Sequence, residues 1–187
     1  MNAVKIDSKN DLSRYFNDES RHNTKHGQIE YLIAMKYIHK YLRPDMKVLV
    51  VGEGGGSYSY ELASQGIAVT AVEMLQSRLD ELNSRITDNM KLITYKGEIC
   101  DLGFLSNDSY DITLVMGPMY HLYTRESRLQ ALSEAVRVTK PNGIIFVSYF
   151  ITDGCIVDLC FNRGFINYFL EQELLEPGTY KLLKNPD

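Results

Sequence analysis

Apolar residues along this chain fall into two alternating patterns, short continuous runs and longer segments with a helical period. The continuous runs predict buried strands at residues 47–51, 67–72, 91–95, 110–116 and 144–150. Apolar residues that recur every three or four positions predict helices at about 27–42, 58–65, 74–86, 124–139 and 153–173, the last as one or two helices. Strands that alternate with helices in this way predict an α/β fold, a Rossmann-like doubly wound sheet of five parallel strands.

The same periodicity locates the apolar positions of two helices. In the first helix the apolar positions are Ile29, Leu32, Ile33, Met35, Ile38 and Leu42. In the helix at 124–139 the expected inner-face residues are Leu129, Leu132 and Val136, and Thr124 can cap the N-terminus.

Residues 52–56 include four glycines and follow directly on the first buried strand. Glycine permits positive φ and lets the backbone come close to a ligand. The next helix would point its free N–H groups at whatever lies over this loop. A strand-to-helix turn without a ligand needs only one or two glycines, so the sequence favours a ligand-binding loop.

Polar or glycine-rich residues also follow the next three strands. Glu73 ends the second strand, residues 98–101 follow the third, and residues 117–121 follow the fourth. In a doubly wound sheet, ligands bind beyond the carboxyl ends of the strands. Four such strand ends therefore predict one shared binding site.

The spacing of these residues narrows the choice of ligand. Glu73 lies 21 positions after Gly52, the distance at which an acidic residue reaches a ribose hydroxyl pair. A nucleoside derivative is therefore expected, either a dinucleotide or S-adenosylmethionine. A dinucleotide loop reads Gly-x-Gly-x-x-Gly, but Ser57 stands at its third glycine position. The order found is Gly-x-Gly-x-Gly, at Gly52, Gly54 and Gly56.

With this loop the chain resembles the class I S-adenosylmethionine-dependent methyltransferases over about residues 27–150. The resemblance also includes Glu73 after the second strand, the segments 97–102 and 137–143, and Tyr110-Asp111. Residues 117–122, Gly-Pro-Met-Tyr-His-Leu, look like a bacterial group of small-molecule methyltransferases. The resemblance implies S-adenosylmethionine as cofactor and S-adenosylhomocysteine as product. It also implies a helical extension or lid at 1–42, followed by a methyltransferase domain at 43–187.

The resemblance assigns cofactor contacts to the glycine loop and the second strand. Gly52, Gly54 and Gly56 would approach the methionine part, and Glu73 would hold the ribose. Family members usually carry a small residue or cysteine where Glu53 stands. The Glu53 carboxylate is therefore expected either to contact the cofactor's amino group or to face solvent.

The adenine and sulfonium contacts are assigned in the same way. Glu98 or Asp101 would take the adenine amino group, with the backbone N–H of Ile99 available to a ring nitrogen. Met116 and Gly117 would line the floor beneath the sulfonium. The expected cofactor-binding set is completed by Tyr58 and Met74.

The candidate chemistry lies after the fourth strand. Methyl transfer from a sulfonium is an in-line displacement, so the enzyme mainly positions the acceptor, the methyl group and the sulfur. A base is needed only if the acceptor must lose a proton, and His121 is the best candidate. Tyr120 could orient a small-molecule acceptor with an N, O or C nucleophile. Equally, His121 could be a structural histidine bonded to backbone.

Composition and charge exclude other classes. A net charge of −4 gives no footprint for nucleic acid or an anionic membrane. Residues 117–120 also lack the Asn/Asp-Pro-Pro-Tyr pattern of nucleic-acid amino methylases. No apolar stretch approaches the ~18 residues of a membrane span. Three cysteines without a Cys-x-x-Cys pair predict a reduced cytoplasmic protein without a metal site.

The C-terminal part differs from the family pattern. The family core has seven strands and this sequence supplies five, so strands six and seven are expected to be missing, by truncation or because a partner completes the edge. An open edge strand invites pairing, which favours a homodimer. Two other functions stay open: a truncated or regulatory protein that binds the cofactor with weak catalysis, and an NAD-dependent oxidoreductase.

Overall fold

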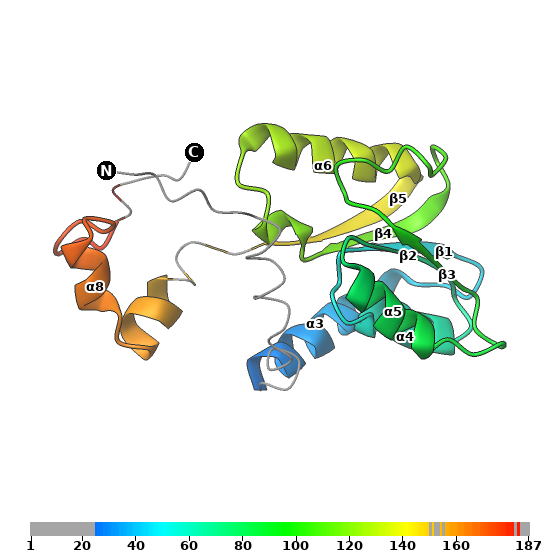
Figure 1. The fold of residues 1–187 in the computed structure, drawn as a ribbon, viewed down its shortest axis with the longest axis horizontal. Helices are drawn as coiled ribbons and strands as arrows, with labels where there is room; N and C mark the ends of the chain where they lie inside the picture. Colours follow the sequence, from blue (N-terminus) through cyan, green and yellow to red (C-terminus); the bar gives the residue numbers. More distant parts are fainter. Residues whose placement is uncertain (1–24, 150, 152–153, 155, 182, 184–187) are drawn as a thin grey trace.

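The structure, a computed structural model, describes residues 25–149, 151, 154, 156–181 and 183 (Figure 1). Five strands form one sheet in the order β3-β2-β1-β4-β5, and all neighbours are parallel. The strands are β1 (Lys47–Val51), β2 (Ala68–Glu73), β3 (Leu92–Lys96), β4 (Tyr110–Met116) and β5 (Thr139–Ser148). The main helices are α3 (Lys25–Tyr41), α4 (Ser57–Ser64), α5 (Gln76–Ser84) and α6 (Arg125–Val138). The predicted doubly wound sheet is confirmed.

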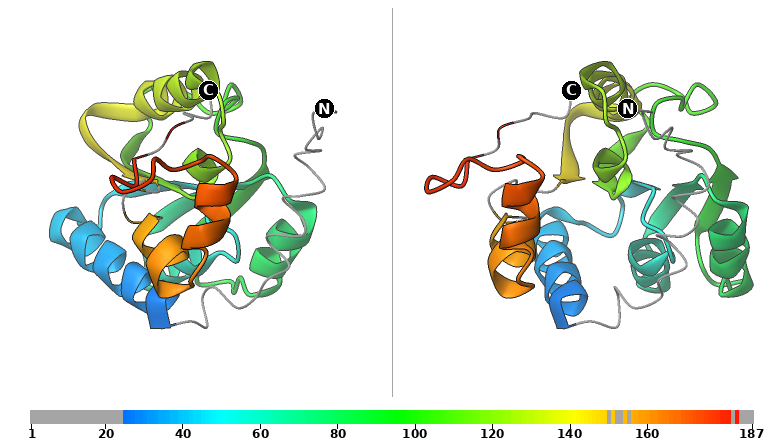
Figure 2. Two further views of the ribbon diagram at one scale, coloured as in Figure 1. Left: turned by 90° about the vertical axis from the view of Figure 1, so that its left-hand side faces the viewer. Right: turned by 60° about the vertical axis from the view of Figure 1, so that its left-hand side comes forward.

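The central strand β1 is buried on both faces, as its uninterrupted apolar sequence predicts. Val48 and Val50 point to one face, where α3, α4 and α5 cover the sheet. Leu49 and Val51 point to the other face, which is covered by α6 and the segment after β3. Both views in Figure 2 place α6 and α3 on opposite sides of the sheet.

The helix α3 contributes only a narrow apolar stripe to the core. Met35 and Ile38 are buried, but Ile29, Leu32 and Ile33 are 56%, 64% and 52% exposed. The apolar residues of α3 lie on more than one side of the helix, and only one side can face the sheet. Their helical period predicted the helix, which is confirmed, but not which of them face the sheet.

The inner face of α6 also differs from the prediction. The predicted residues Leu129, Leu132 and Val136 are 55%, 36% and 62% exposed. The residues buried against the sheet are Ala131, Ala135 and Val138. Small side chains let a helix approach the sheet closely, so the larger apolar residues are left outside. Thr124 does cap α6 as predicted, because its hydroxyl oxygen accepts a hydrogen bond from the Ser127 N–H at 3.1 Å.

The turn predicted at residues 141–143 appears as an irregularity within β5. Tyr110 pairs with Thr139, and Ile112 pairs with Ile144, so four residues of β5 face one of β4. Gly143 is required here, because a Cβ atom would lie 2.9 Å from the backbone oxygen of Asp111.

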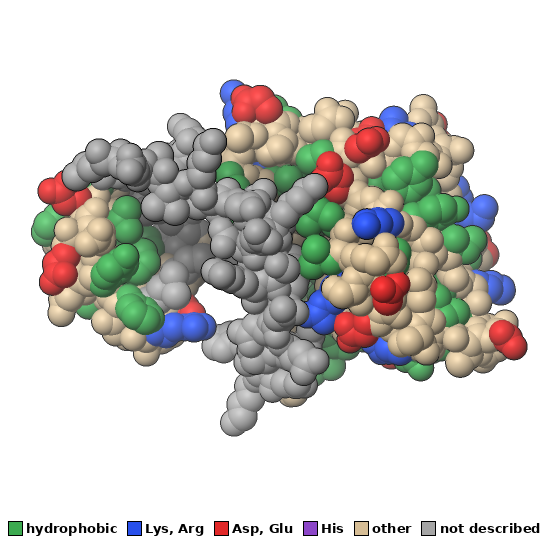
Figure 3. Space-filling model, viewed as in Figure 1, with side chains coloured by type: hydrophobic (Ala, Val, Ile, Leu, Met, Phe, Trp, Pro, Cys, Tyr) green, Lys and Arg blue, Asp and Glu red, His purple; other side chains and the backbone are tan. Residues whose placement is uncertain are grey.

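Two short helices follow the sheet, η2 (Val157–Asn162), a π-helix, and α8 (Ile166–Glu171). They confirm the prediction of helices there, and Figure 3 shows hydrophobic side chains on the surface of this part. Beyond β5, the described residues contain no further strand of the sheet. No helix in the described ranges is long and apolar enough to cross a membrane. Cys100 and Cys160 are free thiols, and Cys155 lies outside the described residues.

Candidate functional site

Loops from four strands meet at the carboxyl edge of the sheet. The Gly52 N–H donates to the Val72 carbonyl at 2.9 Å, which joins the end of β1 to β2. The Gly97 N–H donates to the Glu73 carbonyl at 3.1 Å, which joins β3 to β2. After β4, a Cβ on Gly117 would lie 2.5 Å from the Gly52 carbonyl oxygen. The structure thus brings the four predicted strand ends together.

Three glycines of the loop adopt left-handed backbone conformations. The φ angles are 67° at Gly52, 76° at Gly54 and 74° at Gly56. A Cβ at Gly52 would lie 2.4 Å from Cγ of Pro118, and one at Gly56 would lie 2.6 Å from Cδ1 of Leu82. At Gly54 no heavy atom of the described residues lies within 4 Å of the Cβ position. Gly54 is therefore the point at which a ligand can come closest to the loop backbone.

The side chain of Glu53 turns back onto the first turn of α4. Its Oε2 accepts hydrogen bonds from the N–H groups of Tyr58 and Ser59 at 2.7 and 2.9 Å. Its Oε1 accepts one from the Ser59 hydroxyl. Burial, opposed by these hydrogen bonds, raises the pKa of Glu53 to about 7. The expectation that Glu53 faces solvent is wrong, since it is only 9% exposed.

The occupied N-terminus of α4 argues against a dinucleotide. In dinucleotide-binding folds the pyrophosphate lies at the N-terminus of the helix after the glycine loop. Here two N–H groups at the N-terminus of α4 donate hydrogen bonds to the chain's own Glu53 carboxylate. A second carboxylate, Glu73, is near enough to raise the pKa of Glu53 by charge repulsion. A phosphate over this loop would meet the Glu53 carboxylate on the helix N–H groups, and the ionised form of that carboxylate would repel it.

Glu73 is the buried acid at the end of β2. Its Oε1 accepts a hydrogen bond from the Leu75 N–H at 3.0 Å, while its Oε2 has no hydrogen-bond partner within the part of the chain that the structure describes. Burial raises the pKa of Glu73, and the N–H groups of Leu75, Met74 and Gly54 oppose this rise. A buried oxygen without a donor is costly, and a ribose hydroxyl would supply one. This geometry fits the predicted nucleoside cofactor.

The segment after β3 forms a tight turn. The Asp101 N–H donates to the Glu98 carbonyl at 3.1 Å, and both side chains are exposed. Asp101 Oδ1 accepts from the Gly103 N–H at 3.2 Å, so part of its carboxylate serves the turn itself. Ile99 is buried between them, with its side chain in the core. The adenine assignment stays a prediction, and this geometry favours Glu98 over Asp101.

A pair of charged residues on α6 fixes this turn. Glu134 Oε2 accepts from the Leu102 N–H, and Arg137 Nη2 donates to the Leu102 carbonyl, both at 2.8 Å. Arg137 also donates to the Leu105 carbonyl and to Glu134. The hydrogen bond from Arg137 lowers the pKa of Glu134. Glu134 and Arg137 were not predicted from the sequence, although their spacing of three residues on a helix is typical of such a pair.

The two candidate catalytic residues lie at η1 (Pro118–Tyr120), which follows Gly117. The backbone N–H of His121 donates to the Pro118 carbonyl at 3.0 Å. The rings of Tyr120 and His121 meet edge to face, with centroids 6.4 Å apart. The Tyr120 hydroxyl donates to Oε1 of Glu30, on α3, at 3.5 Å. The structure therefore makes Tyr120 and His121 neighbours and adds a carboxylate beside them.

An apolar hollow of about 520 Å³ opens between α3 and the ends of β4 and β5. It is lined by Glu30, Ile33, Ala34, Tyr37, Met116, Phe146, Val147 and Ser148. Met116 was predicted as part of the site, but its four α3 neighbours were missed. Those four stand at positions i, i+3, i+4 and i+7, the spacing of one helix face, which could have revealed them.

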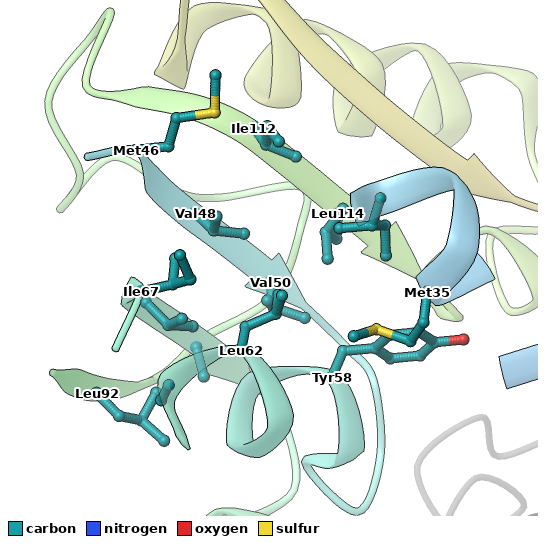
Figure 4. Packing of buried hydrophobic residues seen from close by; sticks show 14 of the residues in the cluster. Met35, Met46, Val48, Val50, Tyr58, Leu62, Ile67, Leu92, Ile112 and Leu114 are labelled. Atoms are coloured by element: carbon teal, nitrogen blue, oxygen red, sulfur yellow. The ribbon is translucent and has the colours of Figure 1, made fainter. Parts of the chain in front are cut away.

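Tyr58 is a core residue rather than a surface of the hollow. It is 6% exposed, and its ring lies 5.1 Å from that of Tyr31. Figure 4 shows its side chain beside Met35 in the core. It supports the loop through its backbone N–H, which donates a hydrogen bond to Glu53. Residues 1–24 of the predicted lid lie outside the described residues.

Comparison with known proteins agrees with this geometry. A family model described as "Methyltransferase domain" matches residues 49–147. The ubiquinone biosynthesis O-methyltransferase of Rickettsia typhi is 32% identical over 128 residues, which cover 68% of this chain and 50% of the relative. The enzyme of the same name from Rickettsia canadensis is 31% identical and is matched over 65% of this chain and 50% of its own length. The chain thus spans about half the length of these relatives.

Solved structures share the fold. A SAM-dependent methyltransferase from Methanosarcina mazei superposes with a TM-score of 0.61 and 21% identity, over 78% of this chain and 74% of that one. The PH0226 protein of Pyrococcus horikoshii gives a TM-score of 0.61 at 18% identity, over 71% and 64% of the two chains. At this identity the likeness extends to the fold alone.

Proposed function

This chain belongs to the class I S-adenosylmethionine-dependent methyltransferases, and we propose that it methylates a hydroxyl oxygen of a small, largely apolar molecule. The apolar hollow, whose Glu30 accepts a hydrogen bond from the Tyr120 hydroxyl, is the observation that carries this proposal. The matched Rickettsia relatives carry the name O-methyltransferase, which supports oxygen as the atom that receives the methyl group.

S-adenosylmethionine, when bound, supplies an electrophilic methyl group on a positively charged sulfur. In our proposal Gly54 leaves the space for it over the loop. Glu73 accepts the ribose hydroxyls through its free Oε2, and Glu98 serves the adenine amino group. Met116 and Gly117 form the floor where β4 ends.

The acceptor would enter between α3 and the sheet. Ile33, Tyr37, Phe146 and Val147 offer it an apolar surface, and Glu30 offers a single charged group. An acceptor with an apolar body and one or a few hydroxyls fits that lining. Because α3 forms one wall, we extend the proposal to a lid role for residues 1–42.

The chain's own groups at η1 would handle the acceptor proton. His121 is the proposed base that takes the hydroxyl proton, since imidazole titrates near neutral pH. Tyr120 orients the acceptor, and Glu30 fixes the Tyr120 hydroxyl at 3.5 Å. An acceptor hydroxyl held in this way would have its oxygen positioned for in-line attack on the methyl group.

Turnover on a panel of hydroxylated aromatic and aliphatic molecules tests the proposal. S-adenosylhomocysteine formation and the mass of the methylated product are the readouts. We expect His121→Ala to lower kcat at least about tenfold, with S-adenosylhomocysteine affinity unchanged. Phe146→Ala should instead raise KM for acceptors with apolar substituents.

The control is Leu129→Ala, an exposed apolar residue on α6 that does not line the hollow. It should leave both kcat and KM unchanged. Cofactor binding without product on any acceptor would overturn the proposal and favour a binding or regulatory protein. Equal loss of cofactor affinity and kcat in His121→Ala would make His121 structural.

A further inference from the structure

The carboxylate of Glu53 is placed where dinucleotide-binding loops leave room for a phosphate. It accepts hydrogen bonds from the N–H groups of Tyr58 and Ser59, in the first turn of α4, and from the Ser59 hydroxyl. A helix N-terminus of this kind attracts anions through its free N–H groups and the helix dipole. In this chain the Glu53 carboxylate already accepts hydrogen bonds from two of these N–H groups and offsets their positive charge.

We propose that Glu53 is a specificity-determining residue, an internal anion that closes the α4 N-terminus to phosphate-bearing nucleotides and keeps the glycine loop selective for a cofactor without phosphate. Two of the backbone donors that would bind a phosphate, the N–H groups of Tyr58 and Ser59, donate to Glu53 instead. Its negative charge then repels any phosphate that approaches the same loop. The inference concerns cofactor choice and does not depend on the acceptor.

The surroundings of Glu53 support an electrostatic role. Glu73, at the end of β2, adds a second carboxylate near the loop. The other titratable groups that interact with Glu53 are the phenols of Tyr58 on α4 and Tyr31 on α3. None of these three groups brings a positive charge to Glu53. Arg85 does bring a guanidinium to the loop, where its Nη1 donates to the Gly55 carbonyl at 3.0 Å, so the repulsion of a phosphate is assigned to the Glu53 and Glu73 carboxylates alone.

Selectivity rather than affinity is the decisive measurement. Calorimetric titration at pH 7.5 gives the ratio of dissociation constants for ADP and S-adenosylhomocysteine. In Glu53→Gln the ratio should shift toward ADP by about tenfold or more, because the repulsion is gone. Glu126→Gln, the same change at an exposed position on α6, should leave the ratio as in the native protein.

A second variant covers the case in which Glu53→Gln does not fold. Ser59→Ala removes one donor that stabilises the ionised carboxylate, so Glu53 is less charged near neutral pH. We expect a smaller shift toward ADP at pH 7 that diminishes as the pH rises and Glu53 ionises. A purely structural loss would not recover with pH.

The inference is overturned if Glu53→Gln weakens ADP and S-adenosylhomocysteine binding in equal proportion, or if the Ser59→Ala ratio does not change with pH. Methyl transfer is not a readout here, so failure of the proposed O-methylation leaves the test intact.

Discussion

Ser59 donates both its backbone N–H and its side-chain hydroxyl to the buried carboxylate of Glu53. One residue at the start of α4 thus fixes an acid that stands between two glycines of the loop. The shape of the loop is held from inside the chain, by α4, before any ligand arrives.

The first prediction concerns stability and pH. Burial raises the pKa of Glu53 from its ordinary 4.5 to about 7 in the folded chain. The folded state therefore holds this proton more tightly than the unfolded state, and the stability that the proton gives is lost as pH rises through 7. The free energy of unfolding should fall between pH 4.5 and pH 7 by up to about 3 kcal/mol from this group.

Urea unfolding across that pH range measures this effect. The pKa of Glu73 is also raised, so it adds a slope of the same sign. The contribution of Glu53 is therefore the difference between the native protein and Glu53→Gln, which should be flatter. Parallel curves for the two proteins would show that Glu53 does not titrate in this range.

Periodicity and glycine spacing were enough to predict the sheet. The five strands are continuous apolar runs, and β4 has the predicted bounds, Tyr110–Met116. Helix faces were predicted less well, because apolar side chains stand on several sides of α3 and α6. In α6 the small Ala131 and Ala135 pack on the sheet, and periodicity alone does not rank them above Leu129.

The residues of the functional site were likewise predicted only in part. Glu73 and the glycines are local signals with a fixed spacing, so sequence could place them. The hydrogen-bond partner of Glu53, Ser59, depends on the path of the loop between them. The local sequence does not determine that path. Glu30 lies 90 positions from Tyr120, and only the packing of α3 brings them together.

The second prediction compares two glycines with positive φ, of which only Gly54 is expected to lie next to the cofactor. Gly54 and Gly66 have φ of 76° and 85°, and at neither position would a Cβ meet a heavy atom within 4 Å. Gly54→Ala and Gly66→Ala should therefore each cost about 1–2 kcal/mol of stability. Only Gly54→Ala should lose S-adenosylhomocysteine affinity, because its Cβ fills space that the cofactor needs. Thermal unfolding and calorimetry check both parts, and equal affinities would place the cofactor away from Gly54.

The third prediction concerns the free oxygen of Glu73. In Glu73→Ala, S-adenosylhomocysteine should bind about 10- to 100-fold more weakly, since a hydrogen bond to a charged group is worth about 1.5–3 kcal/mol. Stability should change little, because the variant also removes a buried oxygen that has no hydrogen-bond partner among the described residues. Asp80→Asn, an exposed acid on α5, is the control and should bind normally. Undiminished affinity in Glu73→Ala would remove Glu73 from the ribose.

The last prediction concerns the outer edge of the sheet. β5 pairs with β4 on one side, and no described strand pairs with its other side. Edge strands with free N–H and C=O groups tend to pair with another chain, so we expect two copies to join through β5. Sedimentation velocity should then give twice the 21.4 kDa of one chain at micromolar concentration. Tyr149→Lys, directly after β5 and 66% exposed, should shift the protein to monomer, whereas Leu129→Lys on α6 should not. A monomer at every concentration would contradict the pairing, and equal dissociation in both variants would move the interface away from β5.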